Sequence, residues 1–313
     1  MDGLNAGNAY GHRPLEENDP ARPLVRGLTH DLIEDLARIY GYDRIPVTDL
    51  ADSLPPQRGN AALEREEAVR DILIGSGLQE IITHSLGNLR QEAALVPGMR
   101  AEDLPAETYV TVANPISQEH AVMRHTLLAN ALETAAANLR FRDRVRLFEV
   151  GKAFLLHPNQ ELPEEPLRLS LVVSGSRRER HWLAPDPGSS DGDPAAGLDF
   201  FDLKGIVETL LERLHVAGLA FEPAEHPAFQ PGRTARLVAR EAGGASVDLG
   251  VLGEIHAAVR EAFDLPPWRV AAAELDLEAL LARVPDTWRV RPASAYPAVL
   301  QDLAVVVDED VPA

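Results

Sequence analysis

The segments VRLFEVGKAFLL (residues 145–156) and RLSLVVSG (residues 168–175) decide the fold, because both are rich in residues that favour β-strands. GLQEIITHSL (77–86) is expected to form a strand earlier in the chain. Three later segments have the same character and are also predicted strands: ARLVARE (235–241), SVDLGVLGEI (246–255) and VAAAELDL (270–277).

Helical segments are mixed with these strands. Apolar residues recur at helical spacing over residues 60–75, 124–140 and 201–214, and Asp202 is a candidate N-cap of the third helix. Strands of unequal length mixed with helices favour an α+β fold with a largely antiparallel sheet. A doubly wound parallel sheet fits less well, because strands and helices do not alternate regularly along the chain.

The composition narrows the class of protein. At 313 residues the chain has room for about two domains, and its net charge of −19 disfavours non-specific binding to nucleic acid. It contains no cysteine, so neither disulfides nor cysteine–zinc sites can form. The absence of cysteine fits a cytoplasmic protein. No apolar run approaches the roughly 20 residues that a membrane-spanning helix needs.

An acidic helix is predicted near the N-terminus, within DLIEDLARIYGYDRIP (31–46). One apolar stripe at helical spacing is expected to be buried, and it consists of Leu32, Leu36 and Ile39. The carboxylates of Asp31, Glu34 and Asp35 share a neighbouring face of this helix. Oxygen ligands of this kind suit Mg²⁺, but a solvated acidic surface has the same spacing, so both interpretations stay open.

The chain lacks a complete catalytic motif. No phosphate-binding GxxxxGK[ST] loop, HExxH zinc helix or GxSxG nucleophile turn is present. The densest basic segment, SGSRRERHW (174–182), is favoured as a solvated turn at the end of a strand, with RNA contact as the alternative.

Six segments, in this order, resemble the beta subunit of bacterial phenylalanyl-tRNA synthetase. They are DLIEDLARIYGYDRIP (31–46), GLQEIITHSL (77–86), NPISQEHAVMRHTLL (114–128), RLFEVGKAF (146–154), DFFDLKGIVETLLERL (199–214) and GVLGEIHAAVREAFDLP (250–266). PGRTA (231–235) and YPAVLQDLAVVV (296–307) add to the resemblance. FDLKG and YGYDRIP are the most specific parts, and the order and spacing agree over nearly the whole chain.

The resemblance implies a division into three parts. Residues 1–50 correspond to the end of a small helical or winged domain, and residues 51–285 to a catalytically degenerate class II synthetase core with an antiparallel sheet and flanking helices. Residues 286–313 correspond to the start of a ferredoxin-like anticodon-binding domain, of which only a first strand at about 296–307 is expected. The chain is therefore expected to be a partial beta subunit, without the oligonucleotide-binding and editing regions of full-length chains.

The same resemblance implies a function and partners. The core would pack against the catalytic alpha subunit in an α₂β₂ enzyme and so support ATP-dependent charging of tRNA(Phe) with phenylalanine. The buried faces of the helices at 60–75 and 124–140 are the candidates for that interface. ATP would be bound by the alpha subunit, and this chain alone is expected to be inactive and to bind tRNA weakly. The family's Mg²⁺ site would use Asp31, Glu34 and Asp35, although a fourth acidic position of the family is Val25 here.

Two other functions are consistent with the same residues. A stand-alone synthetase-like protein could regulate another enzyme by binding it. A different ligase on the same core, such as an amino-acid amide synthetase, would need a pair of arginines gripping ATP, for which Arg124 and Arg146 are the candidates. Arg146 with Glu149 could imitate the arginine and glutamate that hold ATP and the amino acid in class II enzymes. The alternative is an edge strand with a charged face, on which Arg142, Arg144 and Arg146 alternate.

Overall fold

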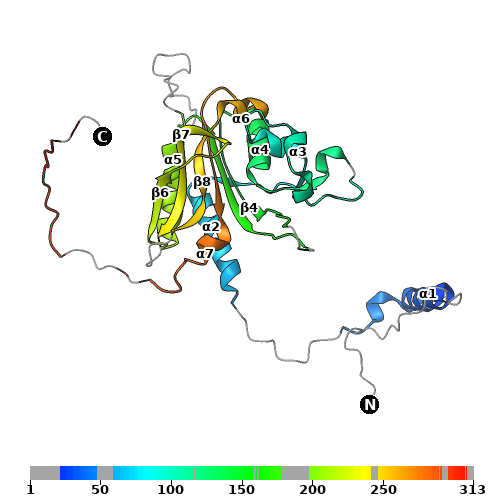
Figure 1. The fold of residues 1–313 in the computed structure, drawn as a ribbon. Helices are drawn as coiled ribbons and strands as arrows, with labels where there is room; N and C mark the ends of the chain where they lie inside the picture. The colour runs from blue at the N-terminus through cyan, green and yellow to red at the C-terminus, as the bar shows by residue number, and fades with distance from the viewer. Residues whose placement is uncertain are drawn as a thin grey trace. The chain divides into compact units, whose positions relative to one another are not determined.

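The structure is a computed structural model that describes residues 22–47, 59–115, 117–157, 160, 162–177, 197–240, 246–288, 290, 295–306 and 308. The chain divides into two compact units, Met1–Arg58 and Gly59–Ala313. Figure 1 traces the elements of both units along the chain. Among the described residues, no helix combines the length and the apolar character needed to cross a bilayer.

The N-terminal unit contains the predicted acidic helix, α1 (Arg22–Tyr40), followed by the short 3-10 helix η1 (Tyr42–Arg44). The expectation that its apolar stripe is buried is wrong in this structure, since Leu32, Leu36 and Ile39 are 59%, 65% and 83% exposed. Helical spacing shows that a face can be buried, but burial also needs a partner surface. None of the described residues of this unit supplies one.

The C-terminal unit is built on a seven-stranded sheet with strand order β1-β4-β5-β9-β8-β7-β6. The strands are β1 (Gln79–Glu80), β4 (Arg144–Lys152), β5 (Leu167–Gly175), β6 (Leu219–Pro223), β7 (Phe229–Arg240), β8 (Ser246–Ile255) and β9 (Val270–Asp276). All neighbouring strands are antiparallel except β1 and β4, so the predicted α+β fold with a largely antiparallel sheet is confirmed. The segment expected as one strand at 77–86 instead contributes β1 and, after a break, the first residue of β2 (Leu86–Gly87), which pairs with β3 (Val122–Met123).

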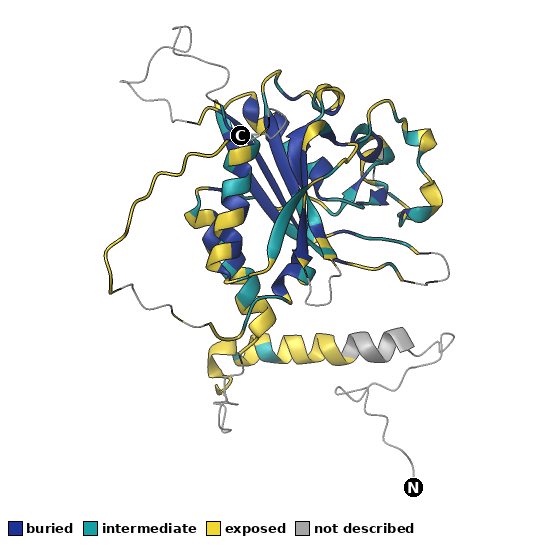
Figure 2. Cartoon of the chain, turned by 60° about the vertical axis from the view of Figure 1, so that its left-hand side comes forward, coloured by how far each residue is buried: buried dark blue, intermediate teal, exposed yellow. Residues whose placement is uncertain are grey.

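Helices cover both faces of this sheet. The helices are α2 (Ala61–Gly75), α3 (Leu89–Ala94), α4 (Leu128–Leu139), α5 (Phe200–Arg213), α6 (Ala257–Ala262) and α7 (Leu277–Leu281), with 3-10 helices η2 (Ala101–Asp103), η3 (Ala106–Thr108) and η4 (Gln118–His120). Helices α2, α5 and α7 share one hydrophobic core with the first face, and α4 and α6 share a second core with the other face. Figure 2 shows the buried central strands between exposed outer helix surfaces.

Both faces of the central strands are therefore buried. On β5, Leu171 and Val173 face the first core and Val172 faces the second, as the two-residue period of a strand requires. The buried faces of α2 and α4 pack against this protein's own sheet. The expectation that these buried faces form the subunit interface is therefore wrong.

Helix α5 begins differently from the prediction. Asp199, not Asp202, is its N-cap: the Asp199 carboxylate accepts hydrogen bonds from the N–H groups of Phe201 (2.9 Å) and Asp202 (3.3 Å). The Asp202 carboxylate accepts in return from the Asp199 N–H at 2.9 Å, which completes a capping box. Asp199 and Asp202 are three residues apart and both fit the N-cap pattern, so the prediction of Asp202 as the N-cap is wrong.

The C-terminal segment forms no strand within the described residues 295–306. Apolar side chains such as Leu300 and Leu303 are exposed there. A strand needs a neighbour to satisfy its backbone hydrogen-bonding groups, and the expected strand at 296–307 pairs with no other described segment.

Candidate functional site

A polar network is enclosed between the second face of the sheet and the segment leading into α4. Arg124 donates from Nη1 to Glu149 Oε1 and to Thr83 Oγ1, both at 2.8 Å, and from Nε to the carbonyl of Lys152 at 3.0 Å. The Thr83 hydroxyl donates to the other oxygen of Glu149 at 2.8 Å. The Arg124 and Glu149 side chains are each only 3% exposed, so this ion pair is satisfied internally and closed to solvent.

A second carboxylate fixes the start of α4. Glu274, on β9, accepts hydrogen bonds from the Thr126 hydroxyl and from the N–H groups of Leu127 and Leu128, both at 3.1 Å. A buried carboxylate at a helix N-terminus satisfies backbone donors that have no partner within the helix. Burial raises the pKa of Glu274, because partial removal from water penalises the charged form, and the hydrogen bond from Thr126 partly opposes this.

Glu92, on α3, is the third acid in contact with this segment, and its side chain is buried. Its carboxylate accepts a hydrogen bond from the N–H of His125 at 3.1 Å, and the His125 ring stacks on Tyr109 with ring centroids 3.6 Å apart. Burial raises the pKa of Glu92 to about 7, and the hydrogen bond from His125 lowers it only in part. The segment 124–128 is thus held by three carboxylates from three different elements.

We expect Glu92 to make stability fall as pH rises. Its folded-state pKa of about 7 lies above the ordinary value of 4.5, so the folded protein binds more protons between these values, and the ionised form is penalised above them. A shift of this size corresponds to about 3 kcal/mol of unfolding free energy lost from pH 4.5 to above 7. Urea unfolding at several pH values should show a shallower fall for Glu92→Gln than for the parent chain.

The matched control is Glu165→Gln, which alters an exposed acid paired with Lys152. That variant should keep the parent slope between pH 4.5 and 7. An unchanged slope in Glu92→Gln would show that Glu92 is not the group that titrates. The raised pKa of Glu274 adds a slope of the same sign, which remains in both variants.

The arginine pairs considered from the sequence do not come together. On β4, Arg146 lies on the same side as Phe148, toward the first core, whereas Glu149 lies on the side of Leu147, toward the second. Arg146 donates to the carbonyl of Ser76 at 2.9 Å, and burial lowers the pKa of its guanidinium. Because Arg124 is bound to Glu149, Arg124 and Arg146 lie on opposite faces of the sheet and form no common ATP-binding pair.

The predicted magnesium ligands lie on α1. Asp31, Glu34 and Asp35 occupy its exposed surface, and the Asp35 carboxylate forms an ion pair with Arg38. Across the described part of the chain, no three acidic or histidine side chains converge in an arrangement that could hold a metal ion. A magnesium site at these residues stays a prediction from the resemblance. The end of the basic segment, residues 178–182, lies outside the described residues.

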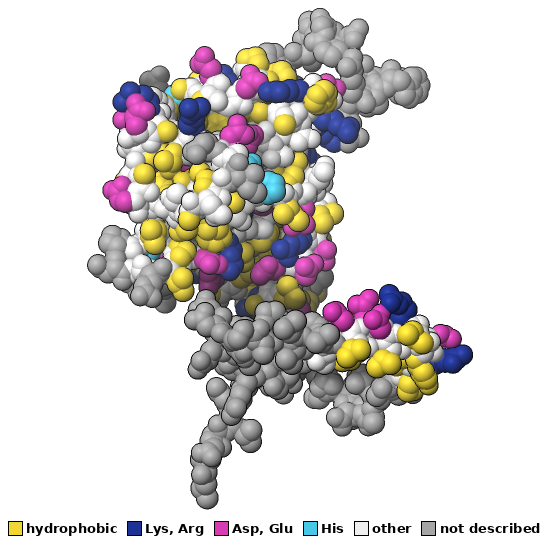
Figure 3. Space-filling model, turned by 90° about the vertical axis from the view of Figure 1, so that its right-hand side faces the viewer, with side chains coloured by type: hydrophobic (Ala, Val, Ile, Leu, Met, Phe, Trp, Pro, Cys, Tyr) yellow, Lys and Arg dark blue, Asp and Glu magenta, His cyan; other side chains and the backbone are white. Residues whose placement is uncertain are grey.

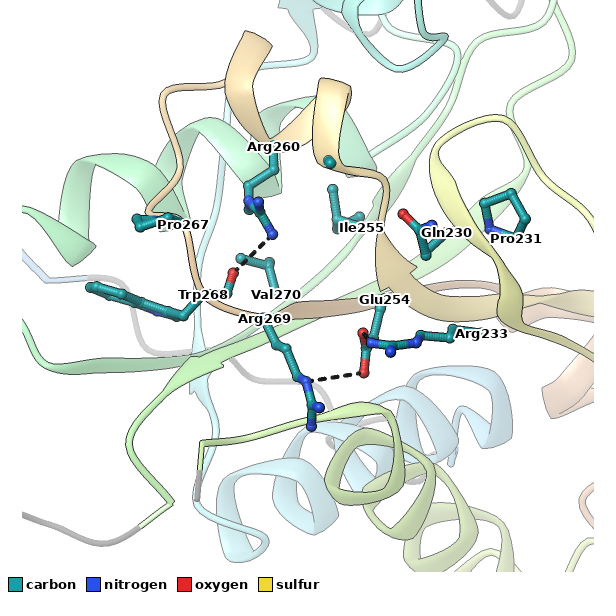
Figure 4. Close-up of a pocket in the computed structure, with 11 residues that line it drawn as sticks. Gln230, Pro231, Arg233, Glu254, Ile255, Arg260, Pro267, Trp268, Arg269 and Val270 are labelled. Carbon is teal, nitrogen blue, oxygen red and sulfur yellow. Dashed lines mark hydrogen bonds and ion pairs between the residues drawn. The ribbon is translucent and has the colours of Figure 1, made fainter. Parts of the chain in front are cut away.

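A cleft of about 720 Å³ lies where β7, β8 and β9 meet, and Figure 4 shows the residues around it. We call it the arginine cleft. Its lining is Gln230, Pro231, Arg233, Glu254, Ile255, Ala257, Arg260, Pro267, Trp268, Arg269 and Val270. Arg233 and Arg269 approach the Glu254 carboxylate from two sides, and Arg260 donates to the carbonyl of Trp268 at 3.4 Å.

A bulge in β7 opens this cleft. Phe229 pairs with Ile255, and the next pair is Thr234 with Gly253, so residues 230–233 lie opposite Glu254 alone. Gly253 permits the close approach, because a Cβ at that position would lie 2.8 Å from the carbonyl oxygen of Arg233. Sequence reasoning did not propose this site, although PGRTA and GVLGEIH both contribute to it.

Comparison with known proteins identifies the family. Residues 45–277 match the family model described as "Phenylalanyl tRNA synthetase beta chain CLM domain", which places the chain among aminoacyl-tRNA synthetase components. The chain belongs to the phenylalanyl-tRNA synthetase beta chain family.

Relatives agree with this match. Proteins named phenylalanine–tRNA ligase beta subunit from Moorella thermoacetica and Symbiobacterium thermophilum are 39% and 36% identical over 90% and 100% of this chain. The relative of the same name from Geobacter metallireducens is 30% identical over 90% of the chain. The chain spans about one third of the length of these relatives: 33%, 34% and 33%, respectively.

Proposed function

We propose that this chain acts as a beta-subunit core of phenylalanine–tRNA ligase, which packs against the catalytic alpha subunit in an α₂β₂ assembly in the cytoplasm. In this role it supports ATP-dependent charging of tRNA(Phe) with phenylalanine, while the alpha subunit binds ATP and performs the chemistry. The observation that carries the proposal is the family match over residues 45–277. The core is proposed to be a degenerate class II synthetase fold.

The enclosed network favours a supporting role over a catalytic one. An arginine and a glutamate could bind the charged groups of a substrate. The side chains of Arg124 and Glu149, however, are each 3% exposed and form an ion pair with each other. A substrate would have to displace these internal hydrogen bonds and reach a closed interior. The network instead holds β4 and the start of α4 in a fixed relation, and a rigid scaffold of this kind can support a partner's site.

The surface available to a partner consists of side chains on α2 and after β1 that the protein's own core does not cover. Leu63 and Ile74 on α2 are about half exposed, and Ile82, after β1, is 91% exposed. Figure 3 shows hydrophobic side chains among charged ones on the face of the C-terminal unit that lies to the right in Figure 1. Exposed apolar side chains at these positions would gain free energy by burial in an interface.

The test is co-purification of this chain with the alpha subunit of the same organism, followed by determination of the mass of the complex. A stable complex is expected, and Ile82→Asp should weaken it because burial of a charge in an apolar contact is unfavourable. Phe201→Asp is the control, since Phe201 is a similarly exposed apolar residue, 75% exposed, on α5. Absence of a complex with a folded chain would contradict the proposal and favour the stand-alone regulatory protein.

A further inference from the structure

The arginine cleft has no part in the proposed packing role. It is formed by two segments that carry the family resemblance, PGRTA (231–235) and GVLGEIHAAVREAFDLP (250–266), together with the start of β9. The enclosed Arg124–Glu149 pair includes none of its residues. Its chemistry therefore needs a separate explanation.

The lining of the cleft is positively charged within a strongly acidic chain. Three arginines, Arg233, Arg260 and Arg269, line the cleft with a single carboxylate, that of Glu254, whereas the chain as a whole carries a charge of −19. Glu254 is 11% exposed at its side chain and orients Arg233 through an ion pair. The lining thus has a net charge of +2, which would favour an anion with two negative charges.

Two of these guanidinium groups have few partners. Arg260 forms no ion pair within the described part of the chain, and its one hydrogen bond there goes to the carbonyl of Trp268 at 3.4 Å. Arg269 lies 3.8 Å from Glu254 and 3.7 Å from Asp199, which is also paired with Arg177. Both distances exceed that of a hydrogen bond, so most of the N–H donors of Arg260 and Arg269 remain available.

The backbone holds the cleft open. The bulge at residues 230–233 contains Pro231 and Gly232, whose φ of +75° suits a residue without a side chain. The Thr234 hydroxyl donates to the carbonyl of Gln230 at 3.0 Å, which closes the base of the bulge. On the opposite side, the Ser174 hydroxyl donates to the carbonyl of Arg269 at 2.8 Å and fixes the start of β9. The arginines are therefore carried on constrained backbone segments.

We infer that the arginine cleft binds a phosphate ester with two negative charges. Guanidinium groups present paired N–H donors that match the oxygens of a phosphate, and a volume of about 720 Å³ admits the rest of a small ligand. The same chemistry is presented by a free phosphate monoester, such as a mononucleotide, and by neighbouring phosphodiesters of an RNA strand. The inference does not depend on the proposed packing against the alpha subunit.

The test is calorimetric titration of the full chain, at low ionic strength, with AMP, with a trinucleotide of RNA lacking a terminal phosphate, and with malonate. AMP or the trinucleotide should bind saturably and malonate much more weakly. Tighter binding of AMP assigns the cleft to a free nucleotide, and tighter binding of the trinucleotide assigns it to an RNA strand. Malonate that binds as tightly as the better of the two would overturn the assignment to phosphate.

Matched variants locate the binding. Arg233→Gln and Arg260→Gln should each weaken it by about tenfold, the loss expected for one charge-assisted contact. Arg240→Gln is the control, because Arg240 is at the other end of β7 and is likewise ion-paired with a glutamate, Glu222. Circular dichroism establishes that each variant is folded. Absence of saturable binding by both phosphate ligands, or equal affinity in all three variants, would overturn the inference.

Discussion

Replacing Glu149 with leucine is expected to lower the unfolding free energy by about 3–5 kcal/mol, the cost of leaving one charge of a buried pair uncompensated. In the variant, Arg124 would keep its hydrogen bonds to Thr83 and to the carbonyl of Lys152, but its buried guanidinium would lose the carboxylate with which it is paired. Urea unfolding followed by circular dichroism measures the change. The double variant Arg124→Met/Glu149→Leu should recover part of the loss, because it removes both charges.

The control for this prediction is Glu165→Leu. Glu165 pairs with Lys152 at 2.8 Å, the same distance as in the buried pair, but their side chains are 45% and 54% exposed. Exposed pairs contribute at most about 1 kcal/mol, so this variant should change stability little. If Glu149→Leu were no more destabilising than Glu165→Leu, the enclosed network would not stabilise the fold in the way we describe.

Most strands of the large sheet and the long helices were predictable because their signals are local, whereas the edge strand β6 (Leu219–Pro223) was not predicted. β5 and β9 are rich in β-favouring or small apolar residues, and α5 carries an uninterrupted apolar stripe. Boundaries were less accurate: α4 begins at Leu128, not near residue 124, because the Thr126 hydroxyl and the Glu274 carboxylate accept from the N–H groups of Leu127 and Leu128. Glu274 is 146 residues further along the chain, so no local pattern points to it.

The candidate site was harder to predict, because its contacts join residues that are distant in sequence. The sequence predicts Arg124 and Glu149 as candidate site residues, but their pairing depends on which face of β4 turns toward α4. The grouping of Arg146 with Glu149 rests on the resemblance to class II enzymes, whereas the two-residue period of a strand places these two side chains on opposite faces of β4. The arginine cleft depends on a shift of register between β7 and β8, which a single sequence does not display.

Register also determines where this fold tolerates no side chain, and Gly250 is the clearest case. It has φ of +129°, and a Cβ there would lie 2.2 Å from the carbonyl oxygen of Glu274 and 2.7 Å from Cα of Leu275, both on β9. The register shift on the other side of β8, between Leu237 and Val238, places Gly250 next to a β-bulge. The residue thus combines an unfavourable backbone conformation for other amino acids with a close approach of two strands.

Gly250→Ala is accordingly expected to cost about 3 kcal/mol or more, the sum of backbone strain and overpacking against a rigid strand. Urea unfolding measures it against Gly205→Ala, in which the new Cβ on α5 meets nothing within 4 Å and should stabilise the helix by up to about 1 kcal/mol. Similar stabilities for the two variants would show that β8 can shift away from β9. A large loss would show that β9 cannot move away from β8, and β9 is the strand that carries the Glu274 carboxylate to the start of α4.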